Sequence, residues 1–140
     1  MNAPTEPEFG IGDASYRAAG GTEGLLKLSH RFYAVMDTLP AARAIRDLHP
    51  ADLSSTTERL AYFLCGWLGG PRLYSEKFGG INIPMFHSHL PIGVAERDAW
   101  LLCMAQAIDE QPYSPEFKQY LLTQLRVPAE RIRMAASHQL

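Results

Sequence analysis

Apolar residues recur at steps of three and four positions along most of the chain, which is the spacing of one face of an α-helix. The first such stripe is Leu25, Leu28, Phe32, Val35 and Met36. No segment alternates between apolar and polar residues over the length that a strand needs. The pattern therefore predicts an all-α protein without internal repeats.

Glycine and proline divide this pattern into short helices. Asp13 or Ser15 can cap a first helix that ends at Gly20-Gly21, and Pro40 ends the next one. A short helical turn is expected over 41–48, and a helix that Asp52 or Ser54 caps is expected to run to Gly69-Gly70-Pro71. The apolar stripe of that helix is Leu53, Thr56, Leu60, Phe63, Leu64 and Trp67. After it we expect a loop over 71–83 with at most one helical turn, and a short helix begun by Pro84. A longer helix is expected over about 95–110. The last helix is expected over about 115–124, with an interruption at Pro128 and a final helical piece over 129–137.

Length and composition limit the classes of protein that this can be. The chain has 140 residues, which suits one domain over 13–140 after a flexible tail over 1–12. The formal charge of −2 offers no basic excess for nucleic acid, and no apolar run is long enough for a membrane span. Without a secretion signal, the chain is expected in the cytoplasm, where Cys65 and Cys103 would remain buried free thiols.

Four polar side chains stand among the apolar faces and carry the candidate chemistry: Tyr33, His49, His87 and Trp100. If buried, each needs a hydrogen-bond partner. Neutral imidazole is a good iron ligand, so His87 is a candidate axial ligand of haem, and an exposed loop histidine is the alternative. His87 and His89 diverge on a helix and no four-ligand set accompanies them, which disfavours zinc. No nucleophile or phosphate-binding motif is present.

Several longer strings together carry a resemblance to a known family. They are FLCGWLGGPRLYSEKFGG over 63–80, a histidine eight residues after the second glycine pair begins, LPIG over 90–93, and ERDAWLLCM over 96–104. With Gly20-Gly21 and Phe32-Tyr33, this combination resembles the group II truncated haemoglobins. The similarity extends from about residue 14 to residue 125.

The resemblance implies a two-over-two helical sandwich around a b-type haem, iron protoporphyrin IX. It implies that His87 is the axial ligand, with Phe86 beside it against the cofactor. It also implies a polar distal side, on which Tyr33 and Trp100 point hydrogen-bond donors at the ligand and His49 completes the cluster. Such donors stabilise a bound dioxygen that carries partial negative charge.

Further residues are expected around the haem. The distal wall should consist of apolar or small side chains: Thr56, Leu60, Phe63 and Leu64. The contacts to the haem propionates should come from Arg59, Arg72, Tyr74 and Lys77. One departure from the group II pattern is the uncharged stretch 81–86, where the family usually carries basic residues before the axial histidine.

The leading functional hypothesis is a haem protein that binds dioxygen, NO, CO or peroxide, with a role in oxygen, NO or peroxide chemistry. A peroxidase-like or NO-detoxifying enzyme that uses an outside reductase is the second hypothesis. A helical interaction module without cofactor is the third. The chain is expected to be a monomer or a weak homodimer.

Overall fold

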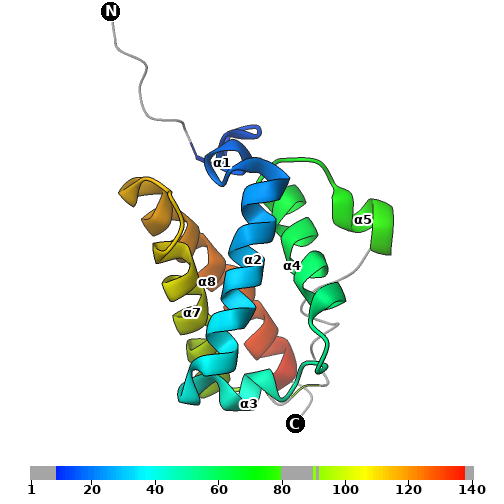
Figure 1. The fold of residues 1–140 in the computed structure, drawn as a ribbon, viewed down its shortest axis with the longest axis vertical. Coiled ribbons are helices and arrows are strands. Elements are labelled where there is room, and N and C mark those ends of the chain that lie inside the picture. The colour runs from blue at the N-terminus through cyan, green and yellow to red at the C-terminus, as the bar shows by residue number, and fades with distance from the viewer. Residues whose placement is uncertain (1–8, 80–89, 91, 138–140) are drawn as a thin grey trace, which may run out of the picture.

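The computed structural model of the chain describes residues 9–79, 90 and 92–137, and within them every regular element is a helix (Figure 1). The predicted all-α class is confirmed. The helices are α1 (Ala14–Ala18), α2 (Gly21–Thr38), the 3-10 helix η1 (Pro40–Ala42), α3 (Arg43–Arg46), α4 (Ser54–Trp67), α5 (Leu73–Phe78), α7 (Val94–Asp109) and α8 (Pro115–Ser137).

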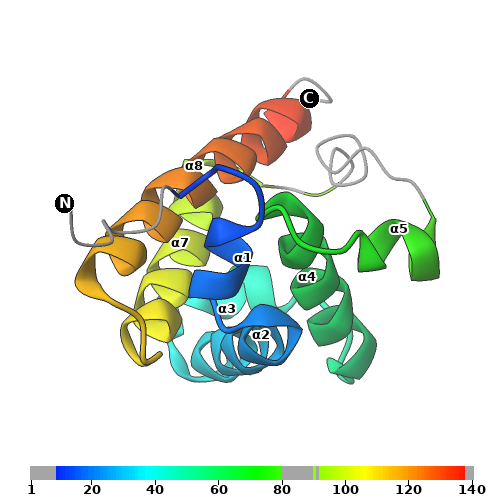
Figure 2. The same ribbon diagram turned by 90° about the horizontal axis from the view of Figure 1, so that it is seen from above.

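Two antiparallel helix pairs make up the fold. α2 packs against α4, α7 packs against α8, and α2 also packs against α7, so that the two pairs lie against each other (Figures 1 and 2). The short elements η1 and α3 close one end of the α2 and α7 pair, while α5 lies on the outside of α4. This is the two-over-two sandwich that the resemblance to group II truncated haemoglobins implies.

The stripe predicted on α2 forms the centre of the core. Its five apolar side chains are at most 1% exposed. They share the core with Met104 and Ile108 of α7 and with Phe117 and Leu121 of α8. Burying each large apolar side chain contributes about 1.5–3 kcal/mol, which explains why this periodicity decides where α2 lies.

α4 has two apolar sides, and the sequence stripe identified the less buried one. Thr57, Ala61, Cys65 and Leu68 are buried together with Leu64. Of the predicted stripe, only Leu64 is fully buried, while the other five members are half-buried. The second side of α4 is therefore an apolar surface that protein side chains cover only in part.

The predicted interruption at Pro128 is wrong, because α8 continues from Pro115 to Ser137 with Pro128 inside it. Proline removes one backbone hydrogen bond but its φ is compatible with a helix. The turn after it is held to α7, because Glu130 accepts hydrogen bonds from Arg97 at 2.7 Å and from Arg133 at 2.6 Å. Ala129 is also buried against the core side. These contacts offset the missing bond.

The glycine pair after α4 permits a close approach that no other residue would. Gly69 has φ +91°, and a Cβ on it would lie 1.9 Å from the Gly12 carbonyl oxygen. A Cβ on Gly70 would lie 2.4 Å from the Tyr16 ring. The predicted end of α4 at this pair is confirmed, and the pair also lets α1 pack onto the end of α4.

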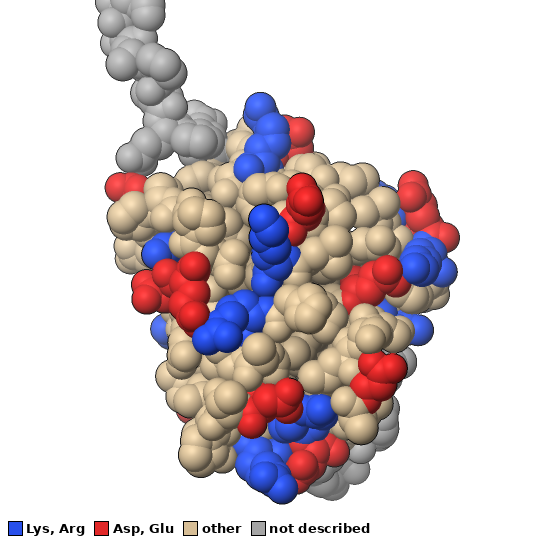
Figure 3. Space-filling model, viewed as in Figure 1, with Lys and Arg blue, Asp and Glu red and all other residues tan. Residues whose placement is uncertain are grey.

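The described residues nearest the N-terminus pack against α8, and residues 1–8 lie outside the described residues. Phe9 packs against Phe117 and Tyr120, with ring centroids 5.1 and 5.0 Å apart. Acidic and basic side chains are interspersed on the face shown in Figure 3, as the near-neutral charge suggests. No described helix is long and apolar enough to cross a membrane. Cys65 and Cys103 are buried free thiols, as predicted.

Candidate functional site

Tyr33 lies on α2 and is only 6% exposed. Its ring meets Phe32 edge-on, with centroids 4.8 Å apart, and meets His49 in the same way at 5.5 Å. Among the described residues, its hydroxyl has no hydrogen-bond partner. Burial raises the pKa of this phenol well above its usual value, so Tyr33 remains a protonated donor.

His49 follows α3 and is half-buried. Its Nδ1 lies 2.7 Å from the Ile45 carbonyl oxygen. Because a carbonyl can only accept, Nδ1 carries the proton, and Nε2 of the neutral ring is an acceptor. His49, expected to complete the polar distal cluster, therefore adds an acceptor to the two donors while its ring is neutral.

Trp100 lies on α7 and reaches the same region from the other side. It is half-buried, and its ring centroid lies 5.1 Å from that of Phe32. In the described part of the chain, its indole N–H has no acceptor. Phe32 is fully buried between Tyr33 and Trp100, so it fixes the spacing between the two donors.

α4 supplies an apolar wall. Three of the four predicted wall residues are half-buried there, and the fourth belongs to the core. Thr56, Leu60 and Phe63 are half-buried, with Phe63 stacked on Trp67 at 6.2 Å. Leu64 is fully buried in the core. The Thr56 hydroxyl makes no bond back to its own helix within the described residues.

Three of the four predicted propionate contacts gather where α5 packs on α4. The Arg59 guanidinium lies over the Phe78 ring at 4.2 Å and donates to the Tyr74 hydroxyl at 3.4 Å. Lys77 Nζ lies 2.6 Å from a Glu58 carboxylate oxygen, and this hydrogen bond raises the Lys77 pKa. The charge of Lys77 is thus already paired. Arg72, the N-cap residue of α5, is exposed and makes none of these side-chain contacts.

The remaining predicted site residues, His87 and Phe86, lie outside the described residues. Ile45, whose carbonyl fixes the tautomer of His49, was not predicted as a site residue. The acceptor is a backbone carbonyl, which every residue carries, so no residue type at this position signals it. Within the described residues, the site thus combines two donors without a protein partner, one on the buried Tyr33 and one on the half-buried Trp100, with one imidazole acceptor and a half-covered apolar wall.

Comparison with known proteins identifies the family to which this chain belongs. A family model described as bacterial-like globin matches residues 14–134. The chain belongs to the bacterial-like globins, among the group II truncated haemoglobins. A curated relative, the group 2 truncated hemoglobin YjbI of Bacillus subtilis, is 32% identical over 120 residues, which cover 86% of this chain and 88% of the relative.

Solved structures agree with this globin in fold and length. The group II 2-on-2 hemoglobin of Agrobacterium tumefaciens superposes with a TM-score of 0.80 at 37% identity, covering 95% of this chain and 98% of that one. The truncated oxygen-avid haemoglobin of Bacillus subtilis gives a TM-score of 0.76 at 32% identity, covering 84% and 97%.

The described residues of this globin fit the haem that globins bind. A haem has two flat apolar faces, and a half-covered apolar side of α4 is a suitable wall for one of them. The Tyr33 hydroxyl, on a side chain that is only 6% exposed, has no partner among the described residues and can donate to a bound group. Both features have a physical reason if a cofactor with a small polar ligand occupies the space between α2, α4 and α7.

Proposed function

We propose that this globin binds haem b between α2, α4 and α7 and uses it to hold dioxygen tightly. The observation that carries the proposal is Tyr33, which is only 6% exposed and whose hydroxyl has no partner among the described residues. Haem supplies an iron with an open coordination position for dioxygen, NO or CO. The protein supplies the axial ligand, the donors and the exclusion of water.

The two donors act on the outer atom of a bound diatomic ligand. The Tyr33 hydroxyl and the Trp100 indole N–H are on different helices, and Phe32 sets their separation. Donors held in a water-excluded site stabilise developing negative charge more than the same groups do in water. Two such bonds slow ligand release and favour polar ligands such as dioxygen over CO.

The oxygen avidity of the Bacillus subtilis relative supports this choice of ligand, since 32% of the aligned residues are identical. We propose His87 as the axial ligand on the basis of the family pattern. His89 is a matched control, because it is the same residue type two positions later.

The test is a titration with hemin, followed by the Soret band. The wild-type protein and His89→Ala should bind one haem and give a globin spectrum, whereas His87→Ala should lose stable haem retention. A wild-type protein that gives no Soret band with added hemin would rule out the proposal. A normal five-coordinate spectrum for His87→Ala would assign the axial position to another residue.

A second candidate function is peroxide reduction, favoured by the tautomer of His49. Neutral Nε2 can accept a proton from hydrogen peroxide and pass it to the oxygen that leaves as water. Reduction of one peroxide to two waters takes two electrons and two protons, which an outside donor molecule must supply. Steady-state turnover no faster than that of free haem, or unchanged in His49→Phe, would exclude this role.

A further inference from the structure

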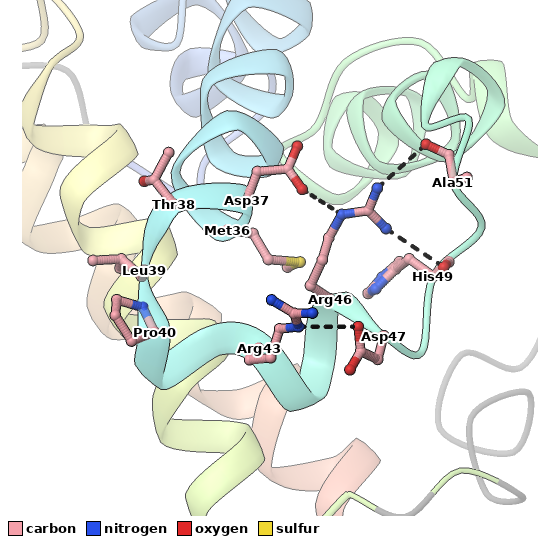
Figure 4. Close-up of a pocket in the computed structure, with 10 residues that line it drawn as sticks. All are labelled: Met36, Asp37, Thr38, Leu39, Pro40, Arg43, Arg46, Asp47, His49 and Ala51. Carbon is pink, nitrogen blue, oxygen red and sulfur yellow. Dashed lines mark hydrogen bonds and ion pairs between the residues drawn. The ribbon is translucent and has the colours of Figure 1, made fainter.

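Arg46 stands at the centre of an open groove of about 720 Å³ beside His49 (Figure 4). Its Nε lies 2.5 Å from a carboxylate oxygen of Asp37. Its Nη1 donates to the carbonyls of Pro50 at 3.1 Å and His49 at 3.4 Å, and its Nη2 donates to that of Ala51 at 3.2 Å. One guanidinium thus holds a carboxylate and three successive carbonyls.

Arg46 also holds the segment 49–51 through its own backbone. It lies between α3 and α4, and Pro50 has no N–H to donate. The His49 N–H donates to the Arg46 carbonyl at 3.0 Å, so that Arg46 holds this segment through both its backbone and its side chain. The Arg46 side chain is 19% exposed, in contrast to the 83% of Arg43 on the same helix.

The carboxylate on the other side of Arg46 belongs to the helix that carries Tyr33. Asp37 follows Tyr33 by four residues, so the two side chains lie on the same side of α2 one turn apart. Arg46 therefore connects the turn after Tyr33 with the segment that carries His49. The two rings that this connection brings together have centroids 5.5 Å apart.

We propose that Arg46 is a positioning residue that sets the place of His49 relative to Tyr33, and thereby the polarity that a bound ligand meets. The proposal rests on the proposed function, because it takes Tyr33 and His49 as the distal pair. Ile45 fixes the tautomer of the imidazole and Arg46 fixes the backbone that carries it. Both residues act through His49.

Lysine cannot take over this role. A guanidinium presents five N–H donors in a rigid planar fork, whereas an ammonium is a compact charge with three donors on a flexible stem. Arg46→Lys keeps the charge and the ion pair with Asp37 but cannot reach all three carbonyls. The groove is open to water, so the released carbonyls are hydrated and the variant still folds.

The first test compares Arg46→Lys and Arg46→Ala with the control Arg43→Ala, which removes an exposed arginine from the same helix. In the haem-loaded protein, both Arg46 variants should split or broaden the infrared C–O stretching band of the CO complex. Oxygen dissociation should accelerate about fivefold. Hydrogen exchange of a peptide spanning 47–53 should accelerate about tenfold. Arg43→Ala should match the wild type in all three measurements.

The second test repeats Arg46→Lys in a His49→Phe background. If Arg46 acts through His49, its effects on the C–O band and on oxygen dissociation should disappear there. Equal effects in both backgrounds would overturn the proposal. So would a lower melting temperature with an unchanged band and rate, because that pattern describes a purely structural residue.

Failure of the proposed function gives a different result. A wild-type protein that takes up no haem shows neither a Soret band nor a C–O band. Hydrogen exchange of 47–53 and the ¹⁵N signals of the His49 ring are then still measurable. Unchanged values of both in Arg46→Lys would show that Arg46 does not hold this segment.

Discussion

Replacing Tyr33 by phenylalanine should have opposite effects on two properties of the protein. Among the described residues the Tyr33 hydroxyl has no partner, and the residue is only 6% exposed. A hydroxyl that makes no hydrogen bond within the protein adds nothing to its stability, and lost hydration of such a group costs up to about 1–3 kcal/mol. Tyr33→Phe should therefore leave the free energy of unfolding of the ligand-free protein unchanged or raise it by about 1 kcal/mol.

The same substitution should weaken ligand retention. A hydrogen bond from Tyr33 to a bound ligand in a dry pocket is worth about 1–3 kcal/mol, and each 1.4 kcal/mol is a factor of ten. Oxygen dissociation, measured by stopped flow, should accelerate about tenfold to a hundredfold. Urea unfolding of the ligand-free protein measures the other effect.

The control is Tyr113→Phe, since the Tyr113 hydroxyl donates to the Ala19 carbonyl at 3.2 Å. This variant should lose about 1 kcal/mol of stability without any change in the rate of oxygen dissociation. The reasoning is refuted if Tyr33→Phe behaves in the same way. That result would mean that the Tyr33 hydroxyl is engaged within the protein and not with the ligand.

Three other substitutions test the packing and charge of the fold. Ser29→Ala should raise the free energy of unfolding by about 1 kcal/mol, because the buried Ser29 hydroxyl has no partner among the described residues. Gly70→Ala should lower the melting temperature, because its Cβ would overlap the Tyr16 ring at 2.4 Å and cost at least about 2 kcal/mol. A hydrogen bond from Arg133 lowers the Glu130 pKa from 4.5 to about 2, so the ion pair stabilises the fold above pH 4.5 and is lost as the pH falls toward 2. Glu130→Gln should make the melting temperature less dependent on pH over that range.

Each of these has a matched control within the chain. Ser15→Ala should destabilise, because the buried Ser15 hydroxyl accepts a hydrogen bond from the Gly10 N–H at 2.8 Å. Gly79→Ala has a positive φ but open space around its Cβ, and should cost less than Gly70→Ala. Glu116→Gln alters an exposed carboxylate of the same helix and should leave the pH profile unchanged. Equal effects within any pair would contradict the corresponding explanation.

Most of the fold was predictable because each helix carries a local signal. The stripe on α2 and the breaks at Pro40 and Gly69 are properties of a few neighbouring residues. Pro128 misled the prediction because the contacts that keep α8 continuous come from Arg97 on another helix. Sequence spacing contains no information on a contact between distant segments.

The site was predictable to a different degree for each residue. Periodicity found an apolar side of α4 but could not tell whether protein or a cofactor covers it, since both need the same residue types. Tyr33, His49 and Trp100 stood out as polar groups among apolar residues, and the family resemblance assigned them to the distal side. In the structure the rings of Tyr33 and Trp100 pack against Phe32, and that of His49 packs against Tyr33. The roles of Ile45 and Arg46 depend on backbone carbonyls, which every residue has, so no residue pattern could reveal them.

The distal groups differ in how firmly the fold holds them. Tyr33 and Trp100 are on the two long helices α2 and α7, which share the core. The position and tautomer of His49 depend on α3, a helix of four residues. Changes in α3 should therefore alter the acceptor while leaving both donors in place. A globin built in this way can adjust its ligand chemistry through a short surface helix, without any substitution in the pocket itself.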